Sequence, residues 1–468
     1  MAAETQKLSL KREVGLIGAI SFIAGTMMGS GIFMSPQSVL VNIGSPGASL
    51  VIWAACGLLA TLGSLCYAEL GTVISESGAE YIYILRIFGQ VVSFMFVFSF
   101  VIVMRPASAT GIALSFAEYA VAPFYHDCTP PEQVVKCVAA AGIVVLAIVN
   151  SMNVRLAMFI QVFSMVIKLV ALAVIIIGGV VLLFKGNTEN FEDSFKGTNV
   201  EISSIGISLY QGLWSYDGWN TLNYVTEELK QPEVNLPRAV IIAIPMVTML
   251  YLLVNVSYLA AMTPKELMSS NAVAVTWGNK VLGSWGWVMS IAAALSAFGS
   301  LNGTFFSGGR VCFVAAREGH MPDILSMAHV NRLTPSPALI FTTAISLLVL
   351  IPGDFQSIVN FFSFTAWFFY AITLSGLLYL KIKKPELPRP YRVPIVIPIL
   401  VIIAAIFLVL APIIDNPAIE YLYVTLFIFS GVLVYVPFIH FKLCPGLLEK
   451  VTVFLQLFLE VAPADKNL

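Results

Sequence analysis

The chain has 468 residues, of which 58% are hydrophobic and only 11% are charged. Soluble globular domains carry about 25% charged residues, so this composition excludes an ordinary soluble protein and indicates a polytopic membrane protein. The formal net charge of −1 offers no argument for nucleic-acid binding. Six cysteines scattered over this length predict neither a disulfide framework nor a metal site, and no small-residue cleavage site follows the charged N-terminus.

Apolar segments long enough to cross a membrane, about 20 residues each, follow one another along the chain. The sequence therefore predicts an all-α polytopic membrane protein with twelve transmembrane helices, over residues 14–40, 48–74, 80–121, 134–153, 156–184, 202–226, 238–261, 284–312, 337–353, 356–380, 393–413 and 418–441. The third segment is too long for one straight crossing, so we expect a tilt, or a kink around Arg105-Pro106. The apolar tail after Pro445 is expected to lie along the inner membrane surface or to pack under the helices.

Basic residues predict the orientation. With a cytoplasmic N-terminus, the inner side receives eighteen of the twenty-five Lys and Arg: Lys7, Lys11, Arg12, Arg86, Arg155, Lys230, Arg238, Arg310, Arg317, Arg332, Lys381, Lys383, Lys384, Arg389, Arg392, Lys442, Lys450 and Lys466. The outer loops keep five, namely Lys136, Lys185, Lys196, Lys265 and Lys280. The positive-inside rule therefore predicts that both termini are cytoplasmic.

Two of the predicted helices carry interruptions. The first contains "TMMGSGIF", in which Gly29 and Gly31 flank Ser30, and the sixth contains "GLWSYDGWN", in which Asp217 and Gly218 interrupt an apolar run. Close helix packing also uses small residues, but a pair of interrupted segments at corresponding positions of an inverted repeat points to a transporter site at the membrane midplane. An unwound helix frees N–H groups that attract a carboxylate and carbonyls that accept from an ammonium group, which suits an amino-acid zwitterion.

The motifs "GTMMGSGIFMSP", "CYAELGT", "APFYHDCTPPE", "YDGWNTLNYVTEEL", "NLPRA" and "AAREGHMP" occur in this order along nearly the whole chain. With them the chain resembles the light subunits of heteromeric amino-acid transporters, in the amino acid–polyamine–organocation superfamily. The "YDGWN" motif most resembles the branch that exchanges cystine and dibasic amino acids for neutral ones. The resemblance implies a five-plus-five inverted repeat with broken helices 1 and 6, sodium-independent exchange, and a disulfide to a heavy-chain glycoprotein in the plasma membrane.

As one transporter domain, the chain is expected to hold a first repeat over 14–184, a second over 202–380, two more spans over 393–441 and a cytoplasmic tail over 445–468. The resemblance also implies substrate contacts. The substrate carboxylate is placed on the N–H groups of Ser30, Gly31 and Ile32, and the α-ammonium on carbonyls around Thr26, Met27 and Trp214. Trp214 also serves as the aromatic gate, Trp367 belongs to the pocket, and Lys168 replaces the cation that sodium-coupled relatives bind.

Asp217 is the acid that most needs an explanation, because a carboxylate in a span costs a few kcal/mol and is functional by default. It is expected to pair with the side-chain cation of a bound lysine or arginine. Alternatively it caps unwound backbone, pairs with a protein group or stays protonated. A pocket of Trp214, Tyr216, Trp219 and Trp367 would instead prefer aromatic or large neutral substrates.

Four further residues carry alternatives. Lys168 lies too deep to reach an interface and is expected either to replace a cation or to pair with a carbonyl or acid. Arg105 is expected to line the vestibule or to reach water at the kink. Cys128 lies in a short outer loop, where an intermolecular disulfide to the heavy chain is expected over a bridge with Cys137 or a free thiol. His320, in "REGHMP", is expected to anchor a loop or an inner gate.

Other function classes fit less well. A cation-coupled symporter on the same fold is the second hypothesis, and a channel would need a continuous polar pathway that so few charges inside spans do not supply. The chain shows no nucleotide-binding loop and no HExxH motif. We therefore expect binding and conformational exchange without bond chemistry, and neither a cofactor nor a metal.

Overall fold

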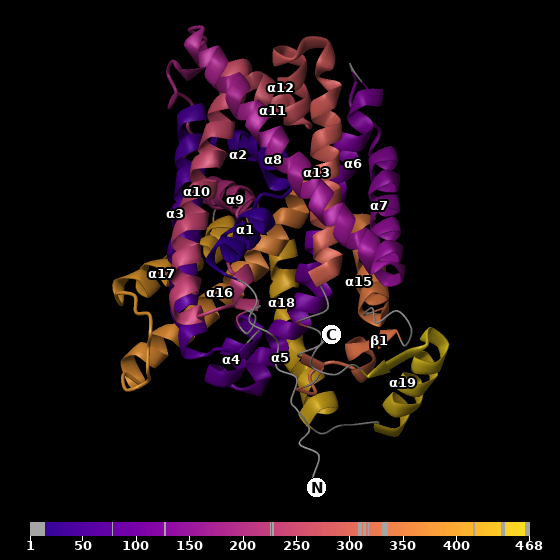
Figure 1. Cartoon of the computed structure of the whole chain (residues 1–468). Helices are drawn as coiled ribbons and strands as arrows, with labels where there is room; N and C mark the ends of the chain where they lie inside the picture. Colours follow the sequence, from indigo (N-terminus) through magenta and orange to yellow (C-terminus); the bar gives the residue numbers. More distant parts are fainter. Residues whose placement is uncertain are drawn as a thin grey trace.

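The computed structural model describes residues 15–76, 78–125, 128–224, 226, 229–307, 311, 315–316, 318–329, 336–414, 417–440 and 445–463. Of the inner basic residues, eight lie outside these ranges: Lys7, Lys11, Arg12, Arg310, Arg317, Arg332, Lys442 and Lys466. The chain folds into long helices that run side by side along one axis, with shorter helices at the two ends of the bundle (Figure 1).

The helices of the first half are α1 (Leu16–Met27), α2 (Gly31–Ile43), α3 (Pro46–Val73), α4 (Glu80–Phe88), α5 (Gln90–Ser99), η1 (Phe100–Met104), α6 (Arg105–Val121), η2 (Ala122–Phe124), α7 (Glu132–Met152), α8 (Val154–Phe184) and η3 (Glu189–Phe191). Those of the second half are α9 (Ile202–Trp214), η4 (Thr221–Tyr224), α10 (Pro232–Ala261), α11 (Pro264–Ser269), α12 (Val273–Val281), η6 (Gly283–Trp285), α13 (Trp287–Ser307), η7 (Asp323–Ser326), α15 (Ser336–Leu350), α16 (Phe355–Lys383), α17 (Val396–Ile414), α18 (Ile419–Tyr435), η8 (Val436–His440) and α19 (Pro445–Leu459).

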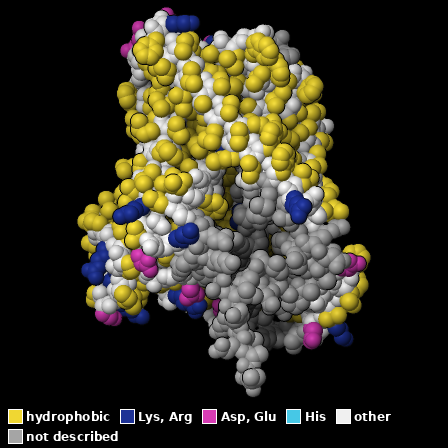
Figure 2. Space-filling model, in the orientation of Figure 1, with side chains coloured by type: hydrophobic (Ala, Val, Ile, Leu, Met, Phe, Trp, Pro, Cys, Tyr) yellow, Lys and Arg dark blue, Asp and Glu magenta, His cyan; other side chains and the backbone are white. Residues whose placement is uncertain are grey.

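The prediction of a helical fold with many membrane spans is confirmed, with one short pair of strands as the exception. Within the described residues, nine helices are long and apolar enough to cross a membrane, and the bent pair α1 and α2 makes a tenth span. The two remaining predicted spans coincide with α15, which is apolar but short, and with the interrupted segment of α9 and η4. Hydrophobic side chains cover the upper part of the visible face, and charged side chains lie at its top edge and over its lower part (Figure 2). That apolar belt is the surface a bilayer requires.

The third predicted span, 80–121, was wrong at its start. Residues Glu80–Phe88 form the separate helix α4, and the span covers Gln90–Phe124. Gly89 separates the two helices with a φ of +93°, a conformation that glycine adopts without strain. Tyr81 to Ile84 are apolar because they are buried against the protein and not because they face lipid. The irregularity expected near Arg105 is the π-helical turn η1, directly before it.

The tail after the last span forms α19, which ends in a short strand. This strand, β2 (Val461–Pro463), pairs antiparallel with β1 (Met327–His329), with His329 opposite Val461. Val461 is buried against Ile324 and Leu325, while the outer side of α19 exposes Leu457 and Phe458. The strand thus packs against the end of the bundle, as one of the two alternatives predicts. Contact of the exposed apolar face of α19 with the inner membrane surface stays a prediction.

Candidate substrate site

The first break lies between α1 and α2, which meet at 51°. Glycine is required here by the approach of the second break, since a Cβ on Gly31 would lie 2.8 Å from the Cα of Ser215. The N–H groups of Ser30, Gly31 and Ile32 have no backbone acceptor within the described residues. They stand at the start of α2, where the helix dipole is positive. The geometry is that of an anion site.

The carbonyl oxygens at the ends of α1 and α9 differ in how many hydrogen bonds they already accept. The oxygen of Met27 accepts from the N–H of Gly29 at 2.8 Å and from the hydroxyl of Tyr251 at 2.7 Å. The oxygen of Trp214 accepts from the N–H of Asp217 at 3.3 Å. The oxygen of Thr26 accepts no hydrogen bond from the described residues. Of the three predicted acceptors for an ammonium group, Thr26 is therefore the most available.

The second break follows α9 and passes through turns before η4. Gly218 has a φ of +103°, and a Cβ there would lie 2.7 Å from Cγ2 of Thr26. Backbone strain and crowding both exclude larger residues at this point. The two breaks are therefore in direct contact, as their pairing in the sequence suggested.

Tyr251 of α10 joins the two breaks, a role that no sequence pattern predicts. Its hydroxyl oxygen lies 2.7 Å from the carbonyl oxygens of both Met27 and Ser215. A hydroxyl has one proton to donate, so it serves these two acceptors in turn. The ring is fully buried and packs edge-on against Trp53 and Tyr216. A tyrosine inside an apolar helix is indistinguishable from core in a single sequence.

A pocket opens beside Asp217. It is lined by Leu213, Asp217, Trp219, Phe362, Ser363, Ala366, Trp367 and Tyr370. Asp217 is partly buried and forms no ion pair with a described residue. The guanidinium of Arg105 attracts it, but that group lies over the ring of Phe100, 5.2 Å from the centroid. The structure thus brings Asp217 and Trp367 together, and none of the described cations lies at contact distance from the carboxylate.

Trp214 and Lys168 flank this arrangement. Trp214 is buried, with its ring edge-on to Phe355 and Phe362 of α16. Lys168 is 3% exposed, and its Nζ lies 3.5 Å from the carbonyl oxygen of Gly25 in α1. The ammonium group therefore sits behind the first break, close to the carbonyls that the end of α1 exposes. Both residues occupy places compatible with their predicted roles.

Cys128 is exposed in the loop that precedes α7, and Cys137 is exposed within α7. Neither forms a disulfide with another described cysteine. His320 is buried, and its Nδ1 shares a 2.8 Å hydrogen bond with the hydroxyl of Tyr81 in α4. This contact fits the predicted loop-anchoring role. Burial lowers the pKa of His320, which keeps the ring neutral.

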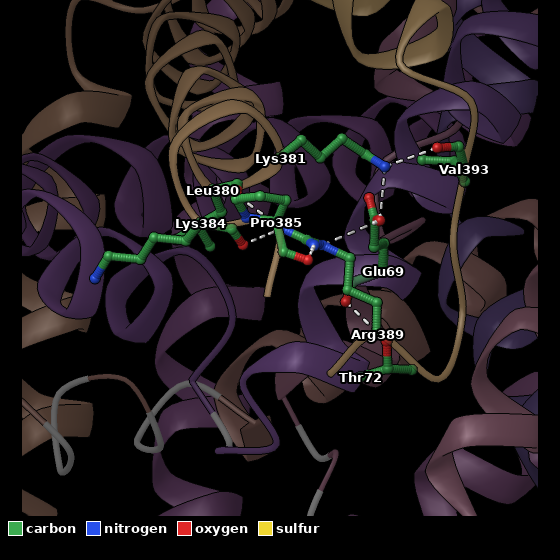
Figure 3. A network of polar contacts seen from close by, with 8 residues as sticks. All are labelled: Glu69, Thr72, Leu380, Lys381, Lys384, Pro385, Arg389 and Val393. Carbon is green, nitrogen blue, oxygen red and sulfur yellow. Dashed lines mark hydrogen bonds and ion pairs between the residues drawn. The ribbon is translucent and has the colours of Figure 1, made fainter. Parts of the chain in front are cut away.

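One ionic network was not foreseen (Figure 3). Glu69, near the end of α3, is fully buried, and its Oε1 lies 2.8 Å from Nζ of Lys381 and 3.8 Å from Nε of Arg389. Lys381 also donates to the carbonyl of Val393 at 2.7 Å, and Arg389 to that of Leu380 at 2.6 Å. The cations come from the end of α16 and the loop after it. The acid of "CYAELGT" and these cations are far apart in the chain, so no spacing signals their contact.

Comparisons with known proteins agree with this architecture. A family model described as amino acid permease matches residues 14–437. The human b(0,+)-type amino acid transporter 1 is 50% identical over 466 residues, covering 99% of this chain and 96% of the relative. The human cystine/glutamate transporter is 42% identical over 470 residues, covering 99% and 93%. The mouse large neutral amino acids transporter small subunit 2 is 42% identical over 421 residues, covering 88% and 78%.

Proposed function

The chain belongs to the amino acid permease family, and we propose that it is a sodium-independent antiporter that exchanges dibasic amino acids and cystine for neutral amino acids. It is a multi-pass membrane protein and not an enzyme. One observation carries the substrate assignment. Asp217 is a carboxylate with no ion-pair partner among the described residues, in a pocket beside two touching helix breaks. The cationic side chain of lysine or arginine supplies the charge that the site lacks.

The substrate's α-carboxylate is assigned to the N–H groups of Ser30, Gly31 and Ile32, because these donors have no backbone acceptor among the described residues. The α-ammonium is assigned to the carbonyls at the end of α1, led by Thr26. The side chain then extends into the pocket towards Asp217, along Trp367, while Trp214 closes over it. A neutral side chain occupies the same pocket by contact with its aromatic walls.

Exchange requires the two broken helices to move while the substrate stays bound between them. Tyr251 supports such coupling, because one hydroxyl serves a carbonyl on each break. Lys168 supports independence from sodium, because a fixed ammonium beside Gly25 supplies the positive charge that a bound cation would bring. Replacement of Lys168 by methionine is expected to weaken exchange of all substrates, and added sodium is expected not to restore it.

A disulfide between Cys128 and a heavy-chain glycoprotein belongs to the same proposal, as do the plasma membrane and cytoplasmic termini. The exposure of Cys128 and the light-subunit resemblance support it. In cells that also express the heavy chain, Cys128→Ser is expected to abolish the high-mass band on a non-reducing gel, with Cys137→Ser as the matched control. Loss of the band in Cys137→Ser alone would assign the bridge to the other cysteine.

Exchange in proteoliposomes tests the function. The full-length chain is reconstituted in vesicles preloaded with leucine, and labelled arginine, cystine or tyrosine is offered outside without sodium. We expect arginine and cystine to enter only when leucine is inside. A second candidate is an exchanger of aromatic and large neutral amino acids, which the ring-lined pocket favours. Entry of tyrosine with no entry of arginine would support that candidate and overturn the first.

A further inference from the structure

Glu80 is a buried carboxylate that the substrate contacts above leave unused. It is 1% exposed and is the first residue of α4. Nδ2 of Asn220 donates to its Oε1, and the hydroxyl of Tyr224 donates to its Oε2 at 2.7 Å. Both donors are neutral, and no described cation forms an ion pair with Glu80. A glutamine side chain can accept from Asn220 through its oxygen and donate through its NH2 group to the hydroxyl oxygen of Tyr224, so these hydrogen bonds alone do not explain a charged residue.

The position of Glu80 relative to the pocket suggests what the charge is for. Four aromatic rings, here called the aromatic floor, pack with centroids 4.7 to 6.5 Å apart: Tyr67, Trp219, Trp367 and Tyr370. All but Tyr67 line the pocket of Asp217. The phenol of Tyr370 lies near both Asp217 and Glu80. Glu80 does not line the pocket, and it belongs to α4, at the lower end of the bundle, where α19 also lies (Figure 1).

We propose that Glu80 forms a second binding subsite for the cationic side chain of a dibasic substrate, on the cytoplasmic side of the aromatic floor. The inference rests on the proposed exchange of dibasic amino acids. A cation that leaves Asp217 towards the cytoplasm enters an apolar layer, where an unpaired charge is costly. The ring faces of the floor attract it, and a carboxylate beyond them offsets the remaining cost. Glu80 has acceptor positions to spare, because a carboxylate offers about four.

The ionisation of Glu80 fits this role. Burial raises the pKa of its carboxyl to about 6. Among the described residues, the titratable groups that face it are tyrosines, which are neutral at cytosolic pH: Tyr67 of α3, Tyr83 of α4, Tyr224 of η4 and Tyr370 of α16. The guanidinium of Arg105 lies near Tyr224 and Asp217 and forms no ion pair with Glu80. Because the pKa of an acid is raised, the charge is present above about pH 6 and is lost below it. The subsite therefore holds a negative charge in a neutral cytosol and weakens on acidification.

The test needs access to both faces of the membrane. In oocytes that express the full-length protein, labelled arginine is injected, and its efflux into medium with saturating leucine is measured against the cytosolic concentration. We expect Glu80→Gln to raise the half-saturating cytosolic arginine about tenfold, as loss of a charged hydrogen-bond partner does. The half-saturating concentrations of cytosolic leucine and of external arginine are expected to stay unchanged. Acidifying the cytosol to pH 6 is expected to raise the half-saturating concentration of cytosolic arginine in the wild type and to leave it unchanged in Glu80→Gln.

Two further variants keep the result interpretable. Glu80→Asp retains the charge and is expected to retain the preference for cytosolic arginine, and Tyr224→Phe removes a hydrogen bond without touching the charge. In Glu80→Gln, an equal rise of the half-saturating concentration for cytosolic leucine, or no rise for cytosolic arginine, would overturn the subsite. A rise specific to arginine in Tyr224→Phe would overturn it as well. If Asp217→Asn leaves arginine exchange intact on both faces, the proposed function itself fails. If Asp217→Asn abolishes it while Glu80→Gln changes nothing, only the subsite fails.

Discussion

Glu69 and Asp217 are acids in the same bundle with opposite surroundings. The carboxylate of Glu69 is fully buried and has Lys381 at 2.8 Å and Arg389 at 3.8 Å. Asp217 faces a pocket, and no cation of the described residues pairs with it. Where a charge serves the fold, this chain supplies the opposite charge itself. Where the described residues supply no opposite charge, as at Asp217, a bound ligand can supply it.

The largest effect on stability is expected from breaking the paired region. Glu69→Gln leaves Lys381 and Arg389 buried without a carboxylate, and removal of one partner from a buried ion pair costs about 3–5 kcal/mol. Thermal unfolding of the detergent-solubilised protein measures this as a marked fall in Tm and in folded yield. A loss below about 1 kcal/mol, the range of exposed ion pairs, would mean that the network is not structural.

Asp217→Asn is expected to act on selectivity and not on stability. The amide keeps the size of the side chain but removes the charge, so arginine exchange should fall about tenfold to a hundredfold, the range of a charged hydrogen bond. Leucine exchange and Tm should change little, because no cation of the described residues lies within ion-pair distance of Asp217 and only the more distant attraction of Arg105 is lost. Uptake of arginine and of leucine over a concentration series measures the selectivity between the two substrates. An equal loss for both would make Asp217 a structural acid like Glu69.

Tyr251→Phe is expected to have a moderate effect that does not depend on the substrate. It removes the hydroxyl shared by the two breaks, worth about 1 kcal/mol. Exchange of arginine and leucine should slow by the same factor. Tyr216→Phe is the matched control, because its hydroxyl bonds the carbonyl of Trp53 at 3.2 Å and joins no breaks. Equal slowing in both variants would assign the effect to packing.

The smallest effect is expected at an exposed ion pair. Glu76 and Arg86 lie 2.9 Å apart with side chains 46% and 48% exposed. Such pairs contribute at most about 1 kcal/mol and weaken with salt. Glu76→Gln should therefore leave Tm nearly unchanged, which sets the scale for Glu69→Gln. A comparable fall in both variants would remove the contrast between buried and exposed pairs.

Apolar length and glycine made most of the fold predictable. Runs of about 20 apolar residues identify spans, and Gly31 and Gly218 mark the breaks because each allows a close approach. The use of apolar runs to identify spans failed at Glu80–Phe88, because helices buried in protein and helices exposed to lipid are rich in the same apolar residues. Gly89, with its positive φ, was the overlooked signal for a new helix.

The site was only partly predictable. Asp217 stood out because an acid in an apolar run is rare, and Gly29 and Gly31 predicted the first break, while the contacts of Ser30 to Ile32 came from the family resemblance. The partners of Glu69 depend on how α3 meets the end of α16, which no local pattern encodes. Tyr251 and Glu80 were missed for the same reason. Their roles arise from contacts with distant backbone and side-chain groups.

Ligand-induced stabilisation of the purified protein tests the central claim most directly, because it needs no transport. Arginine or leucine is added to the wild type and to Asp217→Asn, and Tm is recorded. A ligand at 100 times its Kd stabilises the native state by about 2.7 kcal/mol. We predict that both amino acids raise the Tm of the wild type and that only leucine raises that of Asp217→Asn. Equal stabilisation of both proteins by arginine would contradict the claim that Asp217 binds the substrate's side-chain cation.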